Sequence, residues 1–352
     1  MAIQNYSTVA SRNLIRAAQG MLEHAQPITV LGDFGTQREM PMNSTDTLVF
    51  RRTLPFGAST VGTTVEGSAR YQGTPQITAS NFVLAEGVTP NSNTISFQDV
   101  TVTLQQYGVL FKYSSKVEQL YEDDIPGEMV KLTGETLAEV MELVRYGVLK
   151  AGSTVVYANG TSRSAVNTAI SLNAIRKAAR TLESNRCRRV TSRLAPGVNF
   201  ATRAVQPAYI VFCHTDAVAD IRNLPGFTRV EEYGSYKPIH DREIGACEDF
   251  RFISSPLLTS FAAAGSATLN GMLSVGAAAV DVYPFIVIGE DAWGQVALKG
   301  MQAIKPVVLK ASQTNHANPL GQFGYVGAST WFATVRLNDA WMARIEAGVT
   351  AL

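Results

Sequence analysis

The sequence has little charge of either sign and few cysteines. Charged residues make up 17% of the chain, and 30 Lys and Arg stand against 29 Asp and Glu, so we expect no strong long-range field that gathers nucleic acid or anionic lipid. The three cysteines, Cys187, Cys213 and Cys247, are an odd number without CxxC spacing. This argues against a disulfide framework or a four-thiolate zinc site and predicts three buried thiols.

Long apolar runs are also lacking. Residues 1–14 have no continuous apolar segment, which predicts neither a secretory signal nor a transit peptide and therefore a chain that stays in the cytoplasm where it is made. The most apolar stretch, residues 269–288, is interrupted by Asn270, Asp281 and Pro284. A membrane span takes about 20 mainly apolar residues, so a buried strand pair is the better interpretation and no membrane partner is expected.

Motifs with a known catalytic or phosphate-binding mechanism are missing: the sequence has no GxxxxGK[ST], GxGxxG, HExxH or GxSxG. The best metal candidates are Cys213, His214, His240 and Cys247, whose thiolates and imidazoles suit tetrahedral zinc. Adjacent strand residues point to opposite faces, so Cys213 and His214 cannot easily share one ion. We therefore expect no metal site and no cofactor.

Acid and base catalysis has equally weak candidates. His240 beside Asp241, with one of many serines, is one set, and Glu231 with Glu232 is another. Any chain of this size offers such sets, and solvated loop residues are the preferred interpretation. We expect no catalytic residues and no enzymatic activity.

The N-terminal third contains two segments with too few large apolar residues to fold alone. An amphipathic helix is predicted over residues 12–26, and the arm to which it belongs continues to residue 46. Residues 47–52 read as a strand. From residue 55 to 100 Gly, Ser, Thr, Asn and Gln dominate, and residues 95–104 alternate as a returning strand, which together predict an extended hairpin or lid outside the core.

A long helix is predicted from residue 126 to about 151. Asp123 and Asp124 supply an acidic cap, and Pro126 lacks only an N–H that the first turn does not use. Its apolar stripe consists of Val130, Leu137, Val140, Met141, Val144 and Val148. At 1.5 Å per residue the helix is roughly 35–40 Å long, enough to form the axis of a domain.

A second α+β unit follows. A helix over residues 172–183 leads into a basic tract of Arg186, Arg188, Arg189 and Arg193, which suits either DNA phosphates or the acids of a neighbouring subunit, the second or a solvated loop being preferred. Thr215 and Asp216 are expected to cap a helix to residue 224. Strands over 208–212, 250–253, 285–288 and 295–298 indicate a separate lobe at 205–298. Residues 330–337 read as a strand that passes through Asn338 into a short helix with Trp341 and Ile345.

Several segments together resemble the major capsid protein family of short-tailed bacteriophages related to coliphage N-four, members of the Hong Kong 97-type fold. The segments that carry the resemblance are, in chain order, AEGVTP at 85–90, QYG at 106–108, YP at 283–284, WGQV at 293–296, IKP at 304–306, NPLGQ at 318–322, RLNDAWM at 336–342 and RIE at 344–346. They cover the chain from about residue 47 to its end. Asn318 departs from the aspartate expected there.

The resemblance implies an α+β fold with four parts. These are an N-terminal arm (1–46), an extended loop (53–104), a peripheral domain (47–52 and 105–204, with its spine helix at 126–151, and again 299–352) and an axial domain (205–298). The loop would project onto the next subunit through its apolar residues Tyr71, Ile77, Phe82, Val83 and Leu84.

The function implied is that of a major capsid protein that self-assembles into hexamers and pentamers of an icosahedral head around double-stranded DNA. Its partners would be copies of itself, a scaffold, a portal and decoration proteins, and its place would be the virion. Some relatives cross-link an extended-loop lysine to a neighbour, but the first lysine of this chain is Lys112. The alternatives are a portal or neck protein that forms one ring and a soluble α+β hydrolase.

Overall fold

The computed structural model describes residues 29–43, 45–53, 82–89, 95, 97–120, 124–194, 202–234, 237–276, 278–299, 307–314, 316 and 318–352. The helix expected over 12–26 and the contact candidates Tyr71 and Ile77 lie outside them. The helices of the described residues are α1 (Ser115–Leu120), α2 (Ile125–Lys150), α3 (Leu172–Ser184) and α4 (Val218–Arg222).

The strands fall into two sheets and a ribbon. A five-stranded sheet holds β1 (Thr36–Met40), β4 (Gln105–Ser114), β12 (Trp293–Leu298), β13 (Val307–Leu309) and β14 (Phe323–Arg336). An eight-stranded sheet holds β5 (Val155–Tyr157), β6 (Val190–Leu194), β7 (Thr202–Cys213), β8 (Phe227–Arg229), β9 (Glu243–Cys247), β10 (Phe250–Ser254), β11 (Tyr283–Ile288) and β15 (Met342–Ala347). The ribbon pairs β2 (Thr47–Thr53) with β3 (Phe97–Thr103).

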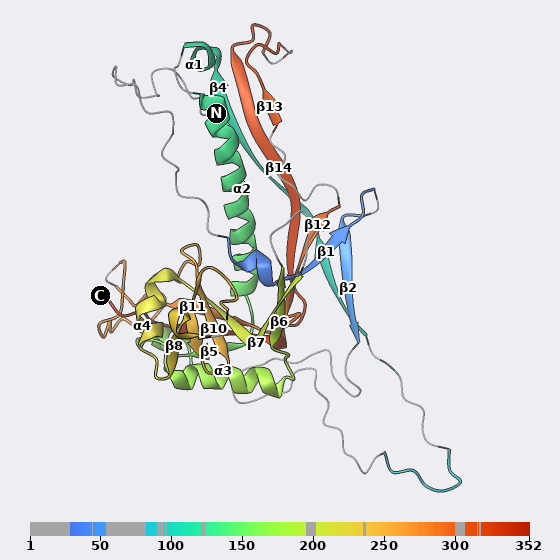
Figure 1. Cartoon of the computed structure of the whole chain (residues 1–352), viewed down its shortest axis with the longest axis vertical. Coiled ribbons are helices and arrows are strands. Elements are labelled where there is room, and N and C mark those ends of the chain that lie inside the picture. The colour runs from blue at the N-terminus through green and yellow to red at the C-terminus, as the bar shows by residue number, and fades with distance from the viewer. Residues whose placement is uncertain are drawn as a thin grey trace.

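The five-stranded sheet and α2 form a narrow extension above a broader lobe (Figure 1). β14 is its centre, because β4 pairs along one side of it while β13 and β12 pair with different parts of the other side. Tyr113, Met129 and Val326 are buried between this sheet and the upper half of α2. The sheet therefore has one covered face and one face turned away from the helix.

The lobe is built in three layers around the eight-stranded sheet. One face packs against α3 and α4 through a core that includes Ile175, Leu182 and Ile221. The other face packs against the lower end of α2 and the short 3₁₀ helix η2 (Leu31–Phe34). β11, whose six residues are all buried, lies between β15 and β7 inside this sheet.

The start of α2 is determined locally, as its sequence predicts. The Asp124 carboxylate accepts the backbone N–H of Gly127 at 3.1 Å, and a proline occupies the first turn. The buried face is not the single predicted stripe, because the helix meets two different layers. Met129 packs against the five-stranded sheet, and Thr133 and Leu137 are buried along the same half of the helix. Tyr146 and Leu149 pack into the lobe, and Glu142 is buried beside them.

The described part of the predicted arm is integral to the subunit core. Val30, Leu31 and Met40 are at most 1% exposed, and β1 pairs in parallel with β12. The prediction of an arm lying outside the core as far as residue 46 was wrong for these residues. Their partners, on α2 and β12, are more than 100 residues distant in sequence, so local composition did not reveal them.

The boundaries expected at residues 205 and 298 do not coincide with the sheets. β5, β6, α3 and β15, expected in the peripheral domain, lie in the lobe with β7 to β11, whereas β12 joins the other sheet. The short helix expected after Asn338 is a 3₁₀ turn (Asp339–Trp341), and Ile345 lies on β15. Strand pairing with β11 buries all six residues of β15, which outweighs the local helix signal.

Two further expectations needed correction. Among the described residues of the apolar stretch 269–288, only those of β11 form a strand, because residues 269–276 and 278–282 lie in turns, bends and isolated bridges rather than in the first strand of a pair. The segment from Thr215 is a 3₁₀ turn followed by α4, and its cap is the imidazole of His214, which accepts the Asp216 N–H at 3.1 Å. No helix among the described residues is long and apolar enough to cross a membrane.

Candidate assembly surfaces

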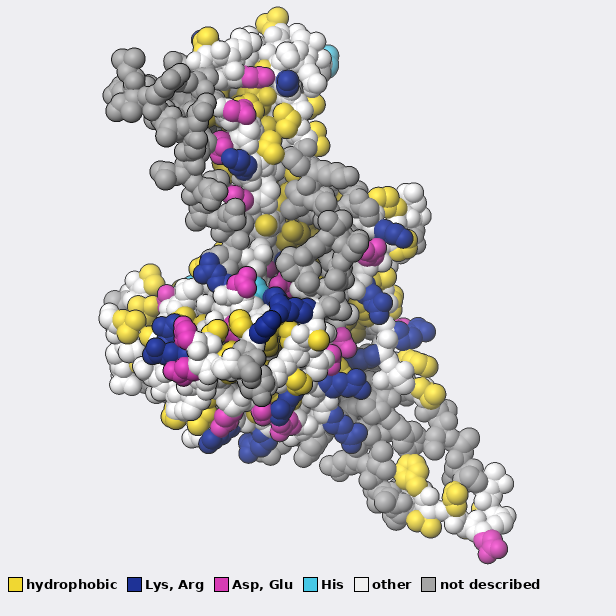
Figure 2. Space-filling view, viewed as in Figure 1, with side chains coloured by type: hydrophobic (Ala, Val, Ile, Leu, Met, Phe, Trp, Pro, Cys, Tyr) yellow, Lys and Arg dark blue, Asp and Glu magenta, His cyan; other side chains and the backbone are white. Residues whose placement is uncertain are grey.

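The β2–β3 ribbon leads out of the subunit toward an exposed apolar tip, which we define as residues 82–89. The ribbon is braced by an ion pair between Arg51 Nε and Asp99 Oδ1 at 2.7 Å. Within the tip, the side chains of Val83, Leu84 and Val88 are 78%, 71% and 65% exposed, and that of Phe82 is 48% exposed. Figure 2 shows these hydrophobic side chains at the lower right extremity, beside the single acid of the tip.

A second apolar surface lies on the face of the five-stranded sheet that points away from α2. Leu110, Val307 and Leu309 are exposed on it, with Phe323 and Tyr325 half-buried between them. Pairing places Leu110 and Val307 on either side of Gly327, and Lys112 and Leu309 on either side of Tyr325. We call this set the outer sheet face.

Gly327 and Lys112 shape the outer sheet face. A Cβ at position 327 would lie 2.8 Å from the Val109 carbonyl oxygen and 3.0 Å from Leu110 Cδ1, so glycine leaves the room that the Leu110 side chain occupies. The Lys112 ammonium lies 3.8 Å from the centre of the Phe323 ring. The surface is thus apolar with a cation at one edge. Sequence reasoning did not single it out, although the alternation in 105–114 and the run Val307–Leu309 are its signals.

The basic tract divides into two pairs of arginines. Arg189 forms an ion pair with Asp249 at 2.8 Å, and Arg193 lies 3.5 Å from Asp33. Both acids belong to the same subunit, so a neighbour is not needed to neutralise these two side chains. Arg186 and Arg188 are exposed and form no ion pair within the described part of the chain.

The base of the N-terminal segment is held to α2 by a buried charge. One carboxylate oxygen of Glu142 accepts the N–H groups of Val30 and Leu31, each at 2.7 Å, and the other accepts from Arg145 at 3.1 Å. Arg145 also donates to Gln295, whose amide donates to the Gly32 carbonyl at 2.9 Å. The network joins η2, α2 and β12 at the junction of the lobe and the extension.

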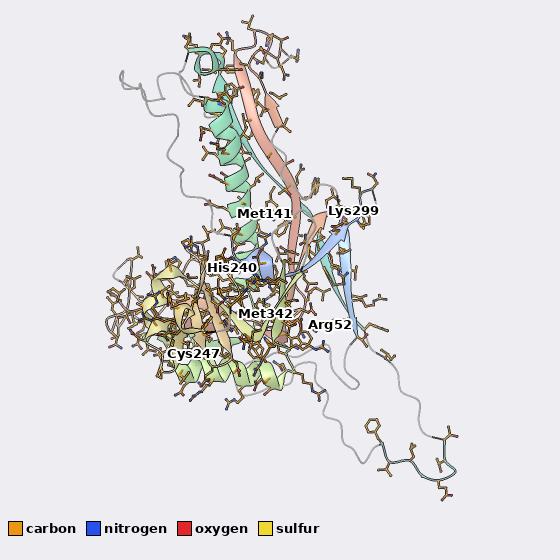
Figure 3. All side chains as sticks on the ribbon, in the orientation of Figure 1. Arg52, Met141, His240, Cys247, Lys299 and Met342 are labelled. Atoms are coloured by element: carbon orange, nitrogen blue, oxygen red, sulfur yellow. The ribbon has the colours of Figure 1, made fainter. Side chains whose placement is uncertain are left out.

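His240 lies at the same junction, on the lobe near the lower end of α2 (Figure 3). Its Nε2 is 3.7 Å from Asp33 Oδ2, and its ring is 6.3 Å from that of Phe34. Burial lowers the pKa of His240 and raises the pKa of Asp33. The attraction between the two groups acts in the opposite direction on each pKa but is the smaller effect. His240 is therefore a packing residue beside an acid of η2, and its Nδ1 accepts the Arg242 N–H rather than facing a nucleophile.

The three cysteines are buried and free, as predicted. Burial raises the pKa of Cys187 to about 12 and shifts that of Cys213 in the same direction. Cys213 directs its thiol at the Ile253 carbonyl while His214 caps a turn, so the two do not converge. The described residues contain no cluster of His, Cys, Asp and Glu that could hold a metal ion.

The remaining catalytic candidates do not form a site. Glu231 and Glu232 are exposed on a 3₁₀ turn (Val230–Glu232). An open depression of about 370 Å³ lies between residues 169–173 and 220–225. Its acid, Asp220, already accepts the N–H and the hydroxyl of Thr350 at 2.8 and 2.7 Å. These features supply no paired nucleophile and base.

Comparison with known proteins agrees with the architecture. A family described as "Phage capsid protein" matches residues 98–341. The major capsid protein of Pseudomonas phage KPP21 is 20% identical over 82% of this chain and 77% of its own length. Among solved structures, the capsid of Ralstonia phage GP4 aligns with a TM-score of 0.61 at 10% identity over 97% of this chain and 99% of that one. The capsid of cyanophage P-SCSP1u aligns at 0.57 and 12% identity over 96% and 93%.

Proposed function

The chain belongs to the phage capsid protein family, as a major capsid protein of the phage head, and we propose that it builds the shell by seating its apolar tip on the outer sheet face of the next copy. The observation that carries this is the pair of exposed apolar surfaces on one subunit. Heterologous contacts close into rings when the rotation between neighbours allows it, and rings of six and five would be the capsomers of this shell.

The two surfaces suit each other chemically. The tip offers Val83, Leu84 and Val88, and the outer sheet face offers Leu110, Val307 and Leu309, all exposed in the isolated subunit. Removing such side chains from water stabilises a contact by roughly 25 cal/mol per Å². The tip carries one charge, Glu86, whereas the outer sheet face carries Lys112 on β4 and is followed on its other side by Lys310, directly after β13. Charge of opposite sign would set the register of the contact.

Further parts of the assignment follow from a shell role. The chain would catalyse nothing and need no cofactor, since it acts through surfaces rather than a pocket. Its place would be the virion, after assembly in the host cytoplasm, as hexamers and pentamers around double-stranded DNA. A scaffold, a portal and decoration proteins would be its other partners. Tyr71 and Ile77 would extend the contact made by Phe82, Val83 and Leu84.

Negative-stain microscopy of the purified protein, with and without a co-expressed scaffold, tests the assignment. We expect shells, tubes or sheets from the wild type and from Val83→Leu, which keeps an apolar tip. Val83→Asp and Leu110→Asp should each leave a folded but unassembled subunit by circular dichroism, because both side chains are largely exposed. A monodisperse wild-type monomer would overturn the shell role, and single rings would indicate a portal or neck protein. Normal shells from both Asp variants would overturn the docking contact alone.

A further inference from the structure

We propose that the turn after α3, with Arg186 and Arg188, forms a contact surface for the phosphates of double-stranded nucleic acid. The inference rests on the shell role only in that a shell encloses DNA. Three observations carry it: the backbone conformation of Arg186, the distribution of ion pairs around it, and the kind of side chains on this side of the lobe.

Arg186 occupies a position that ordinarily takes glycine. Its φ is 54°, and it follows Asn185, the last cap residue of α3. The N–H of Cys187 donates to the Leu182 carbonyl at 3.0 Å and that of Arg186 to Glu183 at 2.9 Å, the two bonds of a Schellman motif, in which glycine is favoured after the cap. A bulky residue in the left-handed region is strained. Strained residues are frequent at functional sites, so the conformation of Arg186 suggests that its side chain has a function.

The turn itself is rigid. The Asn185 amide donates to the Ala340 carbonyl at 3.0 Å, and the Trp341 indole donates to the Asn185 carbonyl at 3.1 Å. The Arg188 carbonyl accepts the Glu290 N–H at 2.9 Å. Both arginines are therefore projected from fixed backbone, with little loop entropy to lose when their side chains bind.

The acids near the turn already have partners. Glu183 and Asp249 contact Arg189, Glu248 pairs with Arg176, and Glu290 accepts from the Thr191 hydroxyl. Arg180, on the exposed face of α3, joins Arg186 and Arg188 in forming no ion pair among the residues that the structure describes. Three guanidinium groups are thus available to an anion on a chain whose net charge is only +1.

The described residues around this turn include no large apolar side chain that is exposed, which favours nucleic acid over a protein neighbour. Between Leu143 and Val275, no described residue is an exposed large hydrophobic. Protein interfaces have an apolar centre, whereas nucleic-acid interfaces are polar and positively charged. The tip and the outer sheet face are apolar, like the centre of a protein interface. The turn after α3 is polar and carries arginines, like a nucleic-acid interface. Figure 2 shows Lys and Arg, interspersed with Asp and Glu, along the lower edge of the lobe, where α3 lies.

Binding of dissociated capsomers to labelled double-stranded DNA of arbitrary sequence, followed by fluorescence anisotropy across salt concentrations, tests the assignment. The double variant Arg186→Gln with Arg188→Gln should bind about tenfold more weakly at low salt. Its slope of log affinity against log salt should fall by about 2, since each phosphate contact contributes roughly 0.9. Arg242→Gln is the matched control, because Arg242 is exposed close to Ile239 on the opposite layer of the lobe.

An unchanged slope in the double variant, or equal losses in Arg242→Gln, would overturn the proposal. So would a double variant that keeps the DNA affinity of the wild type but no longer forms shells, because the arginines would then contact a neighbouring subunit. Failure of the wild type to assemble at all would count against the shell role instead, which separates the two proposals. Shells of normal shape with weakened DNA binding are the expected result.

Discussion

At the junction of the lobe and the extension, the stability of the subunit depends on a single buried residue, Glu142. Glu142 is fully buried and satisfies two backbone N–H groups and one guanidinium. Its removal leaves Arg145, which is only 12% exposed, without the acid that accepts its hydrogen bond. Glu142→Ala should therefore destabilise the subunit by about 3–5 kcal/mol in chemical denaturation.

Glu128→Ala is the matched control for this prediction. Glu128 pairs with Lys131 at 2.9 Å on the same helix, but the lysine side chain is 62% exposed. Surface pairs of this kind contribute at most about 1 kcal/mol. Similar losses in the two variants would contradict the role of Glu142 as the anchor of residues 30 and 31.

His240 predicts a pH dependence of stability. Burial holds its pKa below the ordinary value of 6.5, so the unfolded chain takes up a proton at a higher pH than the folded one. Stability from the neutral ring is present above pH 6.5 and is lost as the pH falls below it. Unfolding free energies at about pH 7.5 and 5.5 should differ less in His240→Gln than in the wild type. Equal differences would show that His240 contributes nothing.

Asn318 stands where the resemblance led us to expect an aspartate, and its contacts explain why asparagine fits. Its amide donates to the Phe323 carbonyl at 2.7 Å, and its oxygen accepts the Gln322 N–H at 2.8 Å. The side chain is buried, and an ionised aspartate in its place has no hydrogen to donate. Asparagine satisfies both backbone groups of this turn.

At the scale of elements, the left-handed conformation of Arg186 at the end of α3 leads us to expect that its substitution by glycine stabilises the subunit. The left-handed conformation costs a non-glycine residue roughly 1–2 kcal/mol, and glycine loses about 0.5–1 kcal/mol more on ordering. Arg186→Gly should therefore stabilise the subunit by about 0.5–1 kcal/mol while weakening DNA binding. A lower midpoint of thermal unfolding in this variant would contradict the assigned strain.

Elements determined by local chemistry could be predicted from the sequence, and elements determined by distant partners could not. Asp124 and Pro126 specify the start of α2 within four residues, and alternation identifies β3. The sequence of β12 indicates a strand, and that of β15 follows a helix-capping asparagine. The sheet that each strand joins depends on partners elsewhere in the chain, β1 for β12 and β11 for β15. In the same way Asp249 and Asp33, which neutralise Arg189 and Arg193, lie 60 and 160 residues away.

At the scale of the whole molecule, order in the tip should depend on assembly. Within residues 82–89 the Val88 N–H donates to the Ala85 carbonyl at 3.3 Å, and every residue of this segment is exposed. Hydrogen exchange at these residues should be fast in capsomers and markedly slower in shells. Residues 129–149 of α2 should be protected in both. Equal protection of the tip in both states would place it in the subunit's own core.

Covalent bonds between subunits should be absent from the shell. Residues 53–104 contain no lysine, so an extended-loop amine cannot attack a neighbour's side chain. Boiled in detergent, particles should run as one band near 37.9 kDa, with or without reductant, because the thiols are buried. A ladder of multiples would refute this prediction.

The two differently oriented buried faces of α2 have a mechanical consequence. Since the upper half is packed on β4 and β14 and the lower half is locked at Glu142 and Tyr146, the helix cannot roll about its axis without breaking both contacts at once. Its length of about 39 Å makes it a strut that keeps the extension at a fixed angle to the lobe. We therefore expect the curvature of a closed particle to be adjusted outside this strut, where the β2–β3 ribbon continues into β4, so that a subunit can occupy flatter and more sharply bent places in the wall without repacking its interior.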